Sequence, residues 1–107
     1  MTFEELKDTV KKVPCQEIRA QADHYLEVVV AKANFAALHT VLQTYFGPPL
    51  KPQGVAPTGD SDRYAGRYGG VRSEQILYVR PKEKGADVAL LWPWGGGSVV
   101  TLKLIRG

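Results

Sequence analysis

Cysteine is almost absent from this chain of 107 residues, and histidine is scarce. Cys15 is the only cysteine, so neither an intramolecular disulfide nor a cysteine-rich zinc site can form. The two histidines, His24 and His39, lack a metal-ligand spacing such as His-x-x-x-His. The sequence gives no sign of a metal centre, and we expect no cofactor.

Long apolar runs are missing as well. None approaches the roughly 18 residues that indicate a membrane span, and residues 1–5 lack the basic start of a signal peptide. Hydrophobic residues make up 44% of the chain and charged residues 23%, which is typical of a folded domain and not of a disordered chain. We expect one soluble, cytoplasmic domain over residues 1–107 that does not associate with membranes.

Residues 34–46 carry the clearest helical pattern. Asn34 is a good N-cap, and Gly47 followed by Pro48 is a typical helix end. Between them, apolar residues recur at helical spacing on one face. These residues are Phe35, Leu38, Val41, Leu42, Tyr45 and Phe46. Such a dense stripe needs a sheet to pack against.

A shorter helix is predicted near the amino terminus. Thr2 and Glu5 have the spacing of a capping box, in which each side chain bonds the backbone N–H of the other residue. Pro14 ends this helix.

Residues 16–32 change to a period of two, which indicates strands. A two-residue turn at Asp23-His24 would mix apolar and polar residues on each face of a hairpin. A three-residue turn at 23–25 sets Ile18 opposite Val30 and keeps one face apolar, so we predict that hairpin. One long bent strand is the alternative.

Three further strands are predicted at 74–80, 86–92 and 98–105, joined by short turns. Short turns imply an antiparallel meander. The predicted fold class is therefore α+β, in the order helix, two strands, helix, long loop, three strands. It forms a two-layer sandwich, with both helices on one face of a mostly antiparallel five-stranded sheet.

The long loop spans about residues 47–72 and is rich in glycine and proline without apolar periodicity. Loops of this length are either functional or disordered, and the composition favours disorder in the first half.

The candidate binding residues lie in the second half of this loop. They are Arg63, Tyr64, Arg67, Tyr68 and Arg72. Arginine binds phosphate or carboxylate through paired hydrogen bonds, and tyrosine can stack on a flat ligand. The alternative is a solvated loop in which Asp60 and Asp62 neutralise two of the arginines.

Trp94 is a second candidate contact, because it follows Pro93 at the tip of a predicted hairpin. Exposed tryptophan is a common interface anchor. Trp94 can equally fold over the end of the core, and Trp92 is expected to belong to the core.

No catalytic constellation is visible, and Cys15 has no base near it in the sequence. We therefore favour a non-enzymatic binding domain, in which the Arg/Tyr loop and Trp94 contact a protein partner or an anionic small ligand. A nucleic-acid-binding domain is an alternative, using the loop and the open face of the sheet. The residues expected on that face are Arg19, Tyr25, Tyr78, Arg80 and Lys103.

Self-association is a second alternative. An exposed sheet edge, or the outer apolar residues Val29 and Val99, would pair two chains into a homodimer or place the chain in a larger complex.

Overall fold

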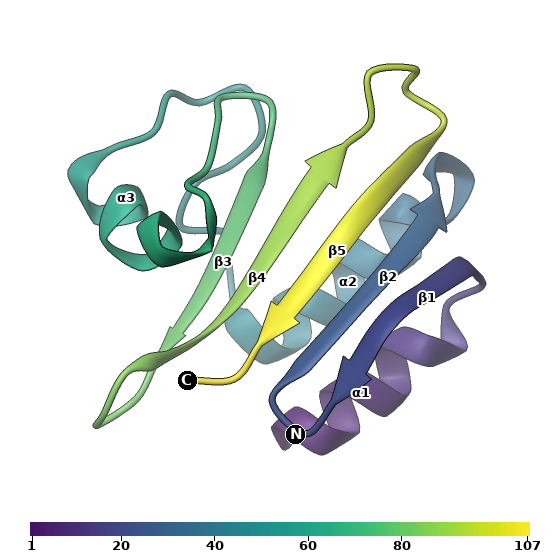
Figure 1. The fold of residues 1–107 in the computed structure, drawn as a ribbon, viewed down its shortest axis with the longest axis horizontal. Coiled ribbons are helices and arrows are strands. Elements are labelled where there is room, and N and C mark those ends of the chain that lie inside the picture. Colours follow the sequence, from purple (N-terminus) through teal and green to yellow (C-terminus); the bar gives the residue numbers. More distant parts are fainter.

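The computed structural model describes residues 1–107 and contains one five-stranded sheet with three α-helices (Figure 1). The helices are α1 (Phe3–Lys12), α2 (Phe35–Phe46) and α3 (Gly59–Ala65), with short 3-10 helices η1 (Lys32–Asn34) and η2 (Gly66–Tyr68). The strands are β1 (Cys15–Ala22), β2 (Tyr25–Ala31), β3 (Ile76–Pro81), β4 (Ala86–Pro93) and β5 (Val99–Ile105).

The strands follow the order β1-β2-β5-β4-β3, and every neighbouring pair is antiparallel. The β2–β5 pairing joins the N-terminal hairpin to the C-terminal meander, so the two halves of the chain share one sheet. The predicted α+β class and element order are confirmed. No helix combines the length and the apolar character needed to cross a membrane.

Helices α1 and α2 cover the same face of the sheet, which is called the inner face below (Figure 1). Leu38, Leu42 and Tyr45 of α2 are buried there against apolar side chains of four strands. The apolar stripe predicted for this helix is therefore confirmed, and it lies where its pattern requires.

The two predicted helix starts differ in outcome. The Thr2–Glu5 capping box forms, with both reciprocal hydrogen bonds present at 3.0 and 3.1 Å. Asn34 does not cap α2, and its side chain donates instead to the carbonyl of Pro14 at 3.4 Å. Asn34 is the last residue of η1 and has φ −100° and ψ 5°. It therefore lacks the extended backbone that an N-cap requires.

The predicted register of the first hairpin is wrong. Ala22 pairs with Tyr25 across a two-residue turn, and Ile18 lies opposite Val28. Two register shifts in β1 change which of its residues lie opposite those of β2. The pairing of apolar with polar residues that a two-residue turn would impose therefore does not continue along the whole strand. Strand β1 is mostly exposed, with Ile18 51% accessible, so matching of apolar faces does not constrain its pairing.

The segment predicted as a loop contains α3 and η2. A capping box between Thr58 and Ser61 starts α3. This helix lies on the face of the sheet opposite α1 and α2, the outer face, beside β3 (Figure 1). A second and smaller core forms beneath it. Its buried members are Ala65, Val71, Leu77, Ala86, Val88, Leu90 and Ile105.

Candidate functional site

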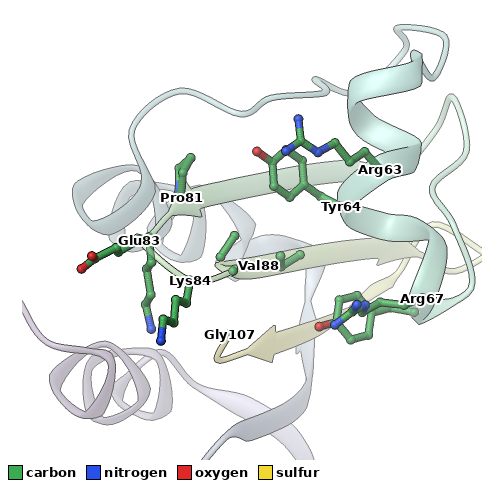
Figure 2. Close-up of a pocket in the computed structure, with 12 residues that line it drawn as sticks. Arg63, Tyr64, Arg67, Pro81, Glu83, Lys84, Val88 and Gly107 are labelled. Atoms are coloured by element: carbon green, nitrogen blue, oxygen red, sulfur yellow. The ribbon is translucent and has the colours of Figure 1, made fainter.

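A cavity of about 620 Å³ opens on the outer face, between α3–η2 and the β3–β4 hairpin (Figure 2). Four of the predicted binding residues line it together. They are Arg63, Tyr64, Arg67 and Tyr68. Ala86 and Val88 of β4 provide apolar surface, and the hairpin adds Lys82 and Lys84.

The local sequence explains how α3 presents these side chains. Ser61 and Ala65, four residues apart, are fully buried, so the small side of the helix lies against the sheet. Tyr64 and Tyr68 pack against the edge of the outer core. After η2 the chain reverses at Gly69, whose φ of 96° favours glycine. The spacing of four therefore brings both Arg-Tyr pairs to one cavity.

The charged side chains on the cavity walls are mostly positive, and three of them have no ion-pair partner. None of Arg63, Arg67 and Lys84 takes part in any of the ion pairs of the structure. Asp60 and Asp62 do not pair with the arginines, contrary to the solvated-loop alternative. The guanidinium of Arg63 lies 5.4 Å from the centre of the Tyr64 ring.

Figure 2 shows Tyr64 and Arg67 extending toward the hairpin. The only acidic side chain that lines the cavity, Glu83, points away at the tip of the hairpin.

Lys82 differs from the other cations because it has a counter-ion. Its Nζ lies 2.7 Å from Oδ1 of Asp87, a fully buried carboxylate that also accepts hydrogen bonds from the Tyr45 hydroxyl and from the backbone N–H of Gly107. Burial by itself would raise the pKa of Asp87, but these hydrogen bonds outweigh it and lower the pKa. Burial and the bond to Asp87 raise the pKa of Tyr45 to about 12. Lys82 therefore belongs to a buried network, and the free cations are the other three.

Two predicted site residues lie elsewhere. Arg72 is exposed and does not line the cavity. Trp94 lies at the opposite end of β4, where its ring nitrogen donates to Oγ1 of Thr101 at 2.7 Å and the Arg19 guanidinium stacks 5.2 Å from its ring. Trp94 remains 44% exposed, but it folds onto the sheet and shares no surface with the cavity.

The open sheet face predicted for nucleic acid is only partly present. Tyr78 is buried on the inner face and bonds the ring of His39. Arg80 is also on that side, 4.4 Å from the Tyr45 ring. Placing these two residues on an open face was wrong, because alternation along β3 turns them toward α2.

The other three residues of that prediction lie on the outer face, and each contacts a neighbouring side chain. Tyr25 packs against the outer core and donates to Glu27 at 2.6 Å. Arg19 pairs with Glu17 and Glu27, which offset its charge. Lys103 stacks 3.9 Å from the Trp92 ring.

The expected outer apolar patch is absent too. Val29 and Val99 are both buried, so they offer no exposed surface for pairing.

Sequence reasoning missed Lys51. This side chain is 1% exposed, and its ammonium donates to the carbonyls of Pro52, Ser73 and Gln75 at 2.6–2.8 Å. Burial lowers the pKa of Lys51, whereas nearby Glu74 favours its charged form. The ammonium joins the two ends of the long segment that carries α3. No local sequence pattern around Lys51 predicts these hydrogen bonds.

Sequence reasoning also missed Lys84, because a lysine in a turn looks like an ordinary solvated residue. Its role depends on α3 lying beside the hairpin.

Comparison of the chain with protein-family models, with curated proteins and with solved structures finds no match.

Proposed function

We propose that this protein is a binding domain whose cavity between α3–η2 and the β3–β4 hairpin takes an anionic ligand. One observation carries the proposal: Arg63, Arg67 and Lys84 line the same cavity and none of them has an acidic partner.

Like charges held close together repel, and an anion between them converts repulsion into charge-assisted hydrogen bonds. Such a basic concavity also raises the local concentration of anions. The rings of Tyr64 and Tyr68 supply flat surface beside the charges, and Val88 adds apolar lining. The site therefore suits an anion that carries a flat or apolar part better than a bare ion.

The experiment is a calorimetric titration with pyrophosphate, a small anion that can contact two or three cations together. We expect Arg63→Ala/Arg67→Ala to weaken binding by roughly tenfold or more, since each charge-assisted bond contributes about 1.5–3 kcal/mol. The control is Lys12→Ala/Arg72→Ala, which removes the same charge from two exposed positions outside the cavity.

The control variant should bind within about twofold of the parent at matched ionic strength. Equal weakening by both double variants would mean that only net charge matters, and the assignment of the cavity would be abandoned.

A further inference from the structure

A second cavity of about 390 Å³ adjoins the first. The two cavities share three lining residues, Arg63, Tyr64 and Pro81, so they lie on either side of these side chains. Together they are called the tandem groove. Apart from the shared residues, the second cavity is lined by Pro48, Pro49, Leu50, Asp60 and Val79.

We propose, building on the anion-binding function above, that the tandem groove binds an extended acidic peptide segment of a partner protein. Acidic side chains of the peptide bind in the first cavity, at Arg67 and Lys84. An apolar side chain at the other end of the peptide packs against Pro49 and Leu50 in the second.

The two halves of the groove differ in chemistry, which favours a ligand with two different parts. Two unpaired cations, Arg67 and Lys84, line only the first half, and Arg63 lies between the two halves. The second half exposes proline rings and Leu50, which is 43% accessible. A small anion satisfies only the first half. Alternate side chains of an extended chain project to the same side about 6.6 Å apart, so a short peptide reaches both.

The backbone of β3 provides a second argument for a peptide. Lys51 and Leu77 exchange both of their backbone hydrogen bonds, at 3.2 and 3.0 Å, along the outer edge of β3. Edge-facing groups recur at every second residue of an antiparallel strand. Val79 therefore turns its N–H and C=O to this edge, and it makes no hydrogen bond there.

The ladder stops because Pro49 has no N–H with which to extend it beyond Lys51. An unpaired donor and acceptor in the wall of the second cavity match the main chain of an added peptide, which is the basis of strand-addition recognition.

Charge gives the bound segment a polarity. Asp60 lines the second cavity, whereas the free cations Arg67 and Lys84 line the first. Acidic residues of the peptide are therefore attracted to the hairpin end and repelled from the Asp60 end. A peptide with an acidic half and an apolar half should bind more tightly than one that is acidic throughout.

The test uses the full chain and fluorescence anisotropy with three labelled peptides. One is an acidic–apolar hexapeptide, Glu-Asp-Glu-Leu-Val-Leu, the second is its reversed sequence, and the third is hexaglutamate. Pyrophosphate is titrated in parallel as the small anion. We expect one of the two acidic–apolar peptides to bind roughly tenfold more tightly than hexaglutamate, through its apolar half.

The variant Leu50→Ser distinguishes the peptide inference from the anion-binding function on which it rests. The matched control is Val55→Ser, since Val55 is 47% exposed in the same segment and lines neither cavity. Leu50→Ser should weaken the preferred peptide by roughly tenfold while leaving pyrophosphate binding within about twofold. Val55→Ser should change neither.

Three results would overturn the peptide inference. If both acidic–apolar peptides bind no more tightly than hexaglutamate, the second cavity contributes nothing to binding. If Leu50→Ser leaves the peptide affinity unchanged, the apolar contact is absent. If sedimentation gives a dimer that Leu50→Ser dissociates, the groove holds a second copy of the chain. In the first two cases pyrophosphate binding that depends on Arg63 and Arg67 still supports the anion site.

Discussion

The two faces of the sheet differ in the size of their buried cores and in whether the charges beside them are paired. The inner face lies under α1 and α2 and forms a core of 18 buried residues, including Leu38 and Leu42. The outer core has 7 buried residues and lies beneath α3. A buried carboxylate, Asp87, is fully paired in the network with Tyr45 and Lys82. At the cavity on the outer face, by contrast, three cations have no acidic partner.

This contrast separates two tasks. Apolar burial is the main favourable term in folding, and most of it lies on the inner face. Unpaired charges contribute little to folding but are available to a ligand. The comparison predicts that inner-face substitutions change stability, whereas substitutions around the outer cavity change binding.

Leu42→Ala should produce the largest loss of stability. Leu42 is fully buried on the inner face, and removing its side chain leaves a cavity that costs about 2–5 kcal/mol of unfolding free energy. Urea denaturation measures this loss. Pyrophosphate affinity at low temperature, where the variant stays folded, should be unchanged. A loss below 1 kcal/mol would show that the inner core is less tightly packed than described.

Lys51→Met tests the anchor of the segment that carries α3. The substitution removes the ammonium donor from the carbonyls of Ser73 and Gln75, at an expected cost of about 2–3 kcal/mol. Amide exchange should also accelerate at Gly54, whose N–H bonds the Ser73 carbonyl. Lys12→Met, at an exposed position, is the control and should be neutral. Unchanged exchange at Gly54 would contradict the anchoring role.

Asp87→Asn tests the buried network through its pH dependence. The folded protein lowers the pKa of Asp87, so its ionised form contributes stability that is present above the unfolded pKa of about 4. That contribution disappears as the pH falls through the folded pKa. At pH 7 we expect the variant to be about 1.5 kcal/mol less stable, because hydrogen bonds to a charged acceptor are weakened.

The difference between the parent and Asp87→Asn should shrink as urea denaturation is repeated at decreasing pH. A constant difference from neutral to acid pH would show that the charge of Asp87 is not what stabilises the network.

Arg63→Ala/Arg67→Ala should have the smallest effect on stability. Both side chains are exposed and neither forms an ion pair, so we expect a change within about 0.5 kcal/mol. Thermal unfolding measures it. A loss above 2 kcal/mol would mean that these arginines hold the outer face together, and the division between the two faces would fail.

The inner face is also the part that the sequence predicts well. The stripe containing Leu38, Leu42 and Tyr45 repeats at helical period, and a periodic apolar pattern depends only on near neighbours in the chain. The first hairpin was mispredicted because β1 contains register shifts and exposes most of its residues. Burial therefore gives its pairing little constraint.

The outer face depends on contacts that a local pattern does not encode. Helix α3 docks through Ser61 and Ala65, two small residues that form no apolar stripe. The spacing of Arg63 and Arg67 indicated a shared site, and the structure places both on one cavity. Spacing alone could not show that Arg72 lies outside this cavity. Lys84 approaches them only through the long-range packing of α3 beside the hairpin.

The most direct test of the outer cavity is a pyrophosphate titration followed by backbone amide chemical shifts. We expect the largest changes at residues 63–68 and 82–86, with little change in α1, in α2 or at Arg72. Shifts spread evenly over basic residues of the whole surface, or an absence of shifts at residues 63–68, would contradict the anion site.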